Sequence, residues 1–87
     1  MTNVIVVEYS YDPALSEDQR AAIMATLRPC LAVREIELLS ELVGLDGRRA
    51  LCVYRALDAE SVRYAHRSEG VASHAAWPAH RKEEASP

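Results

Sequence analysis

The chain opens on a short, continuous apolar run. Val4 to Val7 are β-branched or aliphatic residues, and Glu8 and Tyr9 extend the run. Because the apolar positions are consecutive rather than alternating, this pattern predicts a central strand with both faces covered. Asp12-Pro13 follows as a turn signal.

A helical period begins after this turn. Ser16 is followed three residues later by Gln19, which is a capping-box pattern, and acidic residues in the first turn suit the helix dipole. Apolar residues then recur at helical spacing, with Met24 beside Ile23, Leu27 and Leu31. Proline lacks an N–H donor and clashes with the preceding turn, so Pro29 predicts that the helix ends near Arg28 or kinks there.

Residues 36–55 have the pattern of a β-hairpin. Asp46-Gly47 is a strong turn signal, because glycine takes the positive φ that tight turns need. Strict alternation in the first strand predicts one mainly apolar face and one mainly acidic face: Ile36, Leu38, Ser40 and Leu42 on the first, and Glu35, Glu37, Leu39, Glu41 and Val43 on the second. In the second strand, Ala50, Cys52 and Tyr54 alternate with Leu51, Val53 and Arg55.

A second helix and a short last strand complete the chain. Asp58 is a good N-cap, and Gly70 is a natural residue to end the helix. Residues near Ser73 to Trp77 predict a fourth strand. We expect a single domain over residues 1–80 and a frayed tail over residues 81–87, which are charged or small.

The predicted order is β-α-β-β-α-β, which is typical of the ferredoxin-like α+β fold. In this fold two helices cover one face of a four-stranded antiparallel sheet. The other face needs a cover where it carries apolar side chains. We therefore expect a homodimer of the dimeric α/β-barrel type.

Size and composition narrow the possible settings and partners. An 87-residue chain with two cysteines has no disulfide framework, and no charged segment followed by an apolar one marks a signal peptide. No apolar stretch is long enough to span a membrane. A net charge of −3 argues against a nucleic-acid surface. We expect a cytoplasmic protein that binds neither membranes nor nucleic acids.

Five short motifs follow one another along the chain: Leu15-Ser16, Cys30, Asp46-Gly47, Cys52 to Tyr54, and Asp58 to Arg63. Over residues 3–72 the chain resembles a family of small, mostly bacterial ferredoxin-like proteins that is catalogued as a domain of unknown function, with one nickel-binding branch. The resemblance implies a homodimer, and nickel for some members. The chain departs from the family at Glu41-Leu42, where members have Ser-Tyr, and at Ala56-Leu57, where they often have Ala-Pro.

The three histidines are the candidate metal ligands. Nickel and zinc both accept imidazole, so His66, His74 and His80 form the candidate set, although none of their spacings is a compact ligand pair. The alternative is that His74 and His80 lie on the surface and His66 is a half-buried helix residue. Both cysteines fit structural roles, since free cysteine is among the most buried residue types.

A pocket between helices and sheet is the other candidate site. The candidate ligand-binding residues are Tyr9, Ser40, Tyr64 and Trp77. His66 is the candidate general base, with Tyr54 as its partner, because histidine titrates near neutral pH. Packing of Tyr54 in the sheet and solvation of Tyr64 are the alternative. Arg63 and Arg67 are expected to form surface ion pairs with Glu60, and a clamp for a substrate carboxylate is the alternative.

Three functions are compatible with these features. The first is a small dimeric protein that binds a metal, such as nickel, or a small ligand. The second is a cofactor-independent enzyme, such as a cyclase, isomerase or monooxygenase-like catalyst, acting on a hydrophobic metabolite. The third is an interaction module that uses the acidic strand face of Glu35, Glu37 and Glu41.

Overall fold

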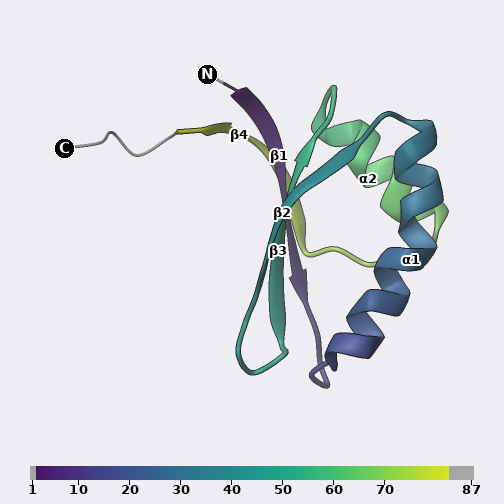
Figure 1. Cartoon of the computed structure of the whole chain (residues 1–87), viewed down its shortest axis with the longest axis vertical. Coiled ribbons are helices and arrows are strands. Elements are labelled where there is room, and N and C mark those ends of the chain that lie inside the picture. Colours follow the sequence, from purple (N-terminus) through teal and green to yellow (C-terminus); the bar gives the residue numbers. More distant parts are fainter. Residues whose placement is uncertain (1, 83–87) are drawn as a thin grey trace.

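The protein folds as a four-stranded antiparallel sheet with two helices on one face (Figure 1). The computed structural model describes residues 2–82. The elements follow one another as β1 (Thr2–Ser10), α1 (Glu17–Val33), β2 (Glu37–Val43), β3 (Arg49–Arg55), α2 (Ala59–Ser68) and β4 (Ala75–Arg81). The strand order is β2-β3-β1-β4, which confirms the ferredoxin-like α+β fold.

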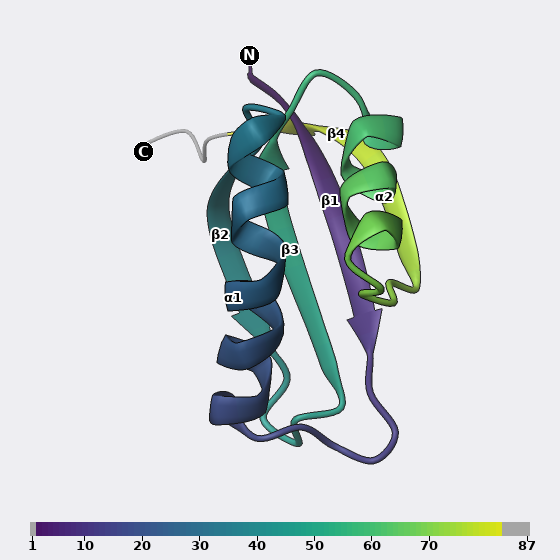
Figure 2. The same ribbon diagram turned by 90° about the vertical axis from the view of Figure 1, so that its right-hand side faces the viewer.

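The two helices lie side by side over different halves of the sheet. Figure 2 shows α1 in front of β2 and β3, and α2 in front of β1 and β4. Ile5, Val7 and Tyr9 of β1 point into the layer between helices and sheet and are buried there. Most of the remaining core comes from both helices and from β3: Met24, Leu27, Leu31, Ala50, Cys52, Tyr54, Val62 and Ala65.

Helix α1 starts as predicted but ends later. Both hydrogen bonds of the capping box between Ser16 and Gln19 are formed. The prediction of an end near Arg28 is wrong, because the helix continues through Pro29 to Val33. Leu31 is buried in the last turn, and packing of an apolar helix face can offset the backbone hydrogen bond that proline removes.

The backbone after α1 adopts a left-handed conformation at a residue other than glycine. Glu35 has φ 57°, and its N–H bonds the Ala32 carbonyl while the N–H of Ile36 bonds the Leu31 carbonyl. This pair of bonds is a Schellman motif, which satisfies the last carbonyls of the helix. Ile36 is buried immediately after the turn, so the motif steers the chain directly into β2.

A β-bulge changes which residues of β2 face the helices. The pairing with β3 shifts between Leu38 and Ser40, so that Leu38 pairs with Tyr54 but Glu41 pairs with Cys52. Residues that pair directly share a face, so Leu38 and Glu41 both lie on the helix side. The predicted strict alternation is therefore wrong beyond Leu38. Ser40 and Leu42 lie on the open side, and the three acidic residues Glu35, Glu37 and Glu41 do not form one strand face.

The hairpin loop also contacts the start of α1. It spans residues 44–48, so it is longer than the two-residue turn suggested by Asp46-Gly47. Gly47 has φ 72° and accepts a hydrogen bond from the N–H of Leu15. A Cβ atom at this position would lie 2.7 Å from the Leu15 carbonyl oxygen, so both the conformation and the close approach require glycine.

Strand β4 lies later in the chain than the sequence indicated. It spans Ala75–Arg81, not Ser73 to Trp77, and pairs with β1 from Glu8 opposite Ala75 to Thr2 opposite Arg81. Pro78 is tolerated because β4 is an edge strand. Arg81, predicted to begin a frayed tail, is the last residue of this strand. The rest of the predicted tail, beyond Lys82, falls outside the described residues.

The sheet face opposite the helices, here called the open face, is largely apolar. Register and burial place these side chains on it: Val4, Val6, Leu42, Leu51, Val53 and Trp77. Leu42 is 66% exposed and Trp77 41% exposed. Among residues 2–82, no helix is both long enough and apolar enough to cross a membrane.

Candidate functional site

Three polar side chains meet in the layer between α2 and the sheet. The Tyr9 hydroxyl lies 2.6 Å from His66 Nε2 and 2.8 Å from the Tyr54 hydroxyl. All three residues are at most 3% exposed. The sequence prediction that His66 and Tyr54 share a site with Tyr9 therefore corresponds to a real cluster, here called the Tyr-Tyr-His cluster.

Strand register brings the two tyrosines together. Tyr9 pairs with Ala50 and Tyr54 pairs with Ile5, so both side chains point to the helix side from neighbouring strands. The partner of Tyr9 in β3 is Ala50, which lies four residues before Tyr54. Two long tyrosine side chains can span this distance. Their hydroxyl groups meet under α2.

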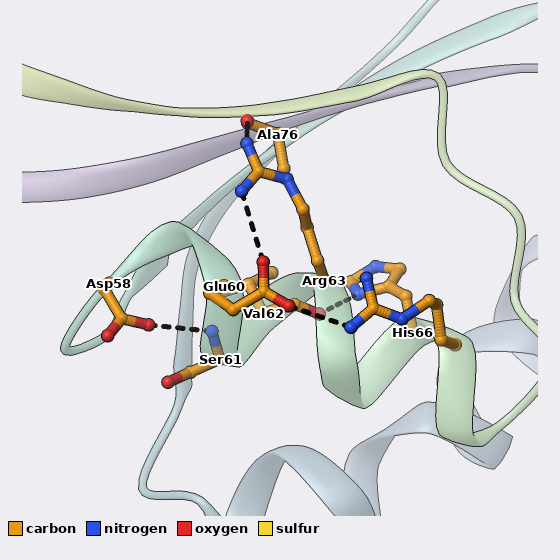
Figure 3. Close-up of polar contacts among 8 residues, drawn as sticks. Asp58, Glu60, Ser61, Val62, Arg63, His66 and Ala76 are labelled. Atoms are coloured by element: carbon orange, nitrogen blue, oxygen red, sulfur yellow. Dashed lines mark hydrogen bonds and ion pairs between the residues drawn. The ribbon is translucent and has the colours of Figure 1, made fainter.

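Helix α2 positions the histidine above them. Asp58 caps the helix through the Ser61 N–H, and Gly70, with φ 67°, ends it in a Schellman motif, as predicted. His66 lies on the same buried helix face as Val62 and Ala65. The helix is also tied to β4, since the Arg63 guanidinium donates to the Ala76 carbonyl at 2.6 Å (Figure 3).

The arginines of α2 are paired with Glu60 on the surface. Glu60 contacts Arg63 at 3.6 Å (Figure 3). It contacts Arg67 at 2.8 Å, and all three side chains are at least 44% exposed. These are the surface ion pairs expected from the sequence, and such pairs contribute little to stability. They lower the pKa of Glu60, chiefly through the hydrogen bond and charge of Arg67.

Backbone contacts set the direction of the hydrogen bonds in the cluster. His66 Nδ1 lies 2.8 Å from the Val62 carbonyl, which can only accept, so Nδ1 carries the proton (Figure 3). In the neutral ring Nε2 is then an acceptor, and the Tyr9 hydroxyl donates to it. With its own proton committed, Tyr9 accepts from Tyr54. The cluster is thus a directed chain from Tyr54 through Tyr9 to His66.

Burial keeps the cluster uncharged near neutral pH. Loss of hydration raises the pKa of both tyrosines, and the neighbouring Tyr54 adds to the effect on Tyr9. The same loss of hydration lowers the pKa of His66, and the hydrogen bond to Val62 opposes this only in part. The cluster can therefore pass or orient protons, but a charged form of it is unfavourable.

Cys52 and Glu41 extend the polar groups toward the edge of the sheet. The Cys52 thiol lies 3.9 Å from Glu41 Oε2. Burial and the negative charge of Glu41 raise the pKa of Cys52 to about 11. This agrees with the predicted structural role of the cysteine, since a thiol that stays protonated is a poor nucleophile. Sequence alternation placed Glu41 away from the helices, and only the bulge reveals this contact.

The remaining predicted site residues lie elsewhere. Ser40 is exposed on the open face, and Trp77 there donates from Nε1 to Glu8 at 2.7 Å. Tyr64 is half exposed, with the Arg34 guanidinium 4.4 Å from the centre of its ring. None of the three takes part in the Tyr-Tyr-His cluster.

The predicted metal ligands do not converge within one chain. His66 is buried with both ring nitrogens hydrogen-bonded, whereas His74 and His80 are exposed. Across residues 2–82, no group of three or more His, Cys, Asp or Glu side chains has a metal-binding arrangement. Within one chain the three histidines therefore do not form the predicted metal site.

An apolar cleft lies beside the cluster, between α1, the end of β1 and the segment after α2. Its volume is about 320 Å³, at the lower end of the ~300–1,000 Å³ typical of ligand pockets. The lining is formed by Ser10, Tyr11, Ile23, Thr26, Glu69, Gly70, Val71 and Ala72. The Tyr11 ring also stacks on Tyr9, with centroids 6.3 Å apart and planes 12° apart. Tyr11 therefore separates the cleft from the Tyr-Tyr-His cluster. Sequence reasoning missed it, because nothing distinguishes it from other loop tyrosines.

Other hollows are larger. One of about 400 Å³, between the start of β1, residues 56–59 and the end of β4, is also mainly apolar but shares no lining residue with the Tyr-Tyr-His cluster. Two more have charged walls. One of about 730 Å³ has Arg34, Glu35 and Arg55 in its wall. Another of about 420 Å³, lined in part by Glu8, Arg49 and His74, lies near the hairpin end of the sheet. Neither reaches the cluster through an aromatic stack like that of Tyr11 on Tyr9.

Comparison with known proteins supports the fold and goes no further. The chain is similar to the protein SCO4226 from Streptomyces coelicolor A3(2), known from a crystal structure, with a TM-score of 0.74. The match covers 95% of this chain and 99% of that chain at 11% sequence identity. No protein-family model and no curated protein matches this chain. At such low identity the likeness concerns the arrangement of helices and strands alone.

Proposed function

We propose that this protein binds a small, largely apolar organic ligand in the cleft between α1 and the segment after α2. The observation that carries the proposal is the position of Tyr11, which forms part of the cleft wall and stacks on Tyr9 of the buried cluster. Apolar walls with a few polar groups are typical of small-molecule sites. The cluster supports the inner wall rigidly, because each of its hydrogen bonds depends on the next.

A neutral fluorescent probe tests this proposal. N-phenyl-1-naphthylamine brightens in apolar sites, so titration with the protein should give saturable binding. Ile23→Trp places a bulky side chain in the cleft and should weaken binding at least tenfold. Val33→Trp is the matched control on the same helix, since Val33 is 80% exposed. Equal binding by both variants, with their folding verified by circular dichroism, would place the probe elsewhere and refute the proposal.

Catalysis without a cofactor is the second candidate, favoured by the 2.6 Å hydrogen bond between Tyr9 and His66. In this role the Tyr11 ring would have to move aside to let the substrate reach the cluster. The substrate would then give a proton to Tyr54 as Tyr54 passes its own proton to Tyr9 and Tyr9 passes its proton to His66. Turnover should then fall strongly in a His66→Gln variant, for any substrate identified in the cleft. Unchanged turnover would leave the cluster a purely structural role.

Nickel at His66 is a further candidate, apart from the predicted three-histidine set, which does not converge within one chain. Binding at His66 would require loss of its bond to Tyr9 or to Val62. Calorimetric titration of untagged protein with NiCl₂ tests this. Heat of binding that disappears in His66→Gln would revive the metal hypothesis, and the absence of heat would end it.

We further propose that a second copy of the chain covers the open face. Leu42 and Trp77 are exposed there above a buried row of valines, and charges of both signs lie at its margins: Glu8, Glu37, Arg49, Arg55 and Arg81. A face with both signs of charge can meet its own copy without net repulsion. Leu42→Asp should shift a dimer toward monomer in sedimentation, and Leu45→Asp, in the exposed hairpin turn, should not. A wild-type monomer at micromolar concentration would contradict the proposal.

A reducing compartment such as the cytoplasm suits this chain. Cys30 and Cys52 are both free. Fractionation of cells expressing a tagged form tests this location, and recovery outside the cytoplasm would contradict it.

A further inference from the structure

The cleft has one charged group in its wall, and that group is acidic. Glu69 is the C-cap of α2. Among the residues that line the cleft, it is the one Asp, Glu, Lys, Arg or His. It forms no ion pair with any other residue of the described chain. The two arginines nearest to it along α2 are engaged by Glu60. Among residues 2–82, this carboxylate beside an apolar space thus has no ion-pair partner.

The backbone around Glu69 adds to the negative potential. The C-terminal end of a helix carries a partial charge of about −0.5 from its aligned peptide dipoles. The N–H groups that an anion would use are already committed. Gly70 donates to the Arg67 carbonyl at 3.1 Å, and Val71 donates to the His66 carbonyl at 2.9 Å.

The side chains of the cleft also favour a cation or a hydrogen-bond donor. The Thr26 hydroxyl donates to the Ala22 carbonyl at 3.1 Å, so its oxygen is left to accept. Tyr11 contributes an aromatic ring to the wall, and aromatic rings attract cations. An anionic ligand would find the Ser10 and Tyr11 hydroxyls as donors but no arginine or lysine in the lining, whereas an ammonium group would find a carboxylate, a hydroxyl oxygen and a ring.

We infer that the ligand of this cleft is an amphipathic amine: an apolar body between α1 and Val71, and a protonated amino group beside Glu69. This assignment rests on the proposed ligand-binding function and adds the charge of the ligand to it. Ile23, Val71 and Ala72 hold the apolar body, and Glu69 selects the cation.

Three probes with the same ring system test the inference: 2-naphthylmethylamine, 2-naphthylmethanol and 2-naphthoate. Each is titrated against displacement of N-phenyl-1-naphthylamine, and amide shifts of Ile23, Thr26 and Val71 in NMR spectra locate the binding. The amine should bind about two- to five-fold more tightly than the alcohol, as expected for an exposed ion pair, and the carboxylate more weakly than both. Added salt should reduce the advantage of the amine.

Variants separate this inference from the function it rests on. Glu69→Gln should make amine and alcohol bind alike without changing the affinity for the alcohol. Glu17→Gln, at the start of α1, should leave the advantage of the amine intact. If the alcohol binds in the cleft but the amine has no advantage, or keeps it in Glu69→Gln, the inference is overturned while the proposed function stands. If none of the three probes binds, both are overturned.

Discussion

The directed hydrogen bonds of the Tyr-Tyr-His cluster predict that two very similar substitutions differ in cost. Tyr9→Phe removes the hydroxyl that donates to His66 and accepts from Tyr54. It leaves an acceptor on His66 and a donor on Tyr54 without partners, both in residues no more than 2% exposed. Each buried polar group without a partner costs about 1–3 kcal/mol, so Tyr9→Phe should destabilise the protein by about 2–6 kcal/mol.

Tyr54→Phe removes a hydroxyl of the same size from the same cluster. Tyr9 loses one incoming hydrogen bond but still donates to His66, so no donor is left unpaired. The expected cost is that of one ordinary hydrogen bond, about 0.5–1.5 kcal/mol. The difference in unfolding free energy between the two variants therefore follows from which hydroxyl donates each hydrogen bond, since both variants remove the same atoms.

Urea unfolding of both variants measures this difference. Protein concentration must be held constant, since dimerisation would contribute to apparent stability. Similar slopes with denaturant would show that the unfolded reference state is unchanged. The ¹⁵N shifts of His66 should also identify the tautomer with the proton on Nδ1. A cost for Tyr54→Phe equal to or above that for Tyr9→Phe, or the other tautomer, would refute the proposed direction.

Three further predictions concern other parts of the structure. Because burial lowers the pKa of His66 below its value of about 6.5 in the unfolded chain, stability should be full above that pH and decline as pH falls toward the folded pKa. Unfolding curves between pH 7 and 5 should show a smaller loss of stability in His66→Gln than in the wild type. His74→Gln, which changes an exposed histidine, should lose stability as the wild type does. An unchanged loss of stability in His66→Gln would mean that other groups cause it. Reaction with Ellman's reagent at pH 8 should be fast at Cys30 and slow at Cys52, because Cys52 is buried and its pKa is raised to about 11. A fast phase that persists in Cys30→Ser would contradict this prediction. Glu35→Gly should raise the unfolding free energy by about 0.5–1 kcal/mol, since φ is 57° there, and a loss of stability would mean that the side chain makes contacts that offset the backbone strain.

Local sequence signals correctly predicted the helix ends that are set by capping residues. Ser16 and Gln19 form the capping box, and Gly70 ends α2. These features depend on backbone groups within a few residues, so the information is local. The errors came where packing at a distance decides. Helix α1 continues through Pro29 to a last turn in which Leu31 packs into the core, and a local pattern does not reveal that packing.

The candidate site shows the same division. Tyr9, Tyr54 and His66 were each identified from the sequence, but their meeting depends on the register of β1 with β3 and on how α2 lies across them. Residue type alone does not encode that geometry. Trp77 and Tyr64 satisfied the same chemical criteria, yet both lie outside the cluster, because exposure is decided by the face on which each side chain lies.

The two edges of the sheet have a consequence for how molecules of this protein meet at high concentration. One edge strand, β2, has an irregular pairing at its bulge, and the other, β4, contains Pro78. Bulges and prolines are features by which natural sheets discourage strand-by-strand addition of further chains. Growth of extended cross-β fibres from the folded state is therefore disfavoured at both ends of the sheet. Concentrated solutions should remain free of thioflavin-positive fibrils while the native fold persists.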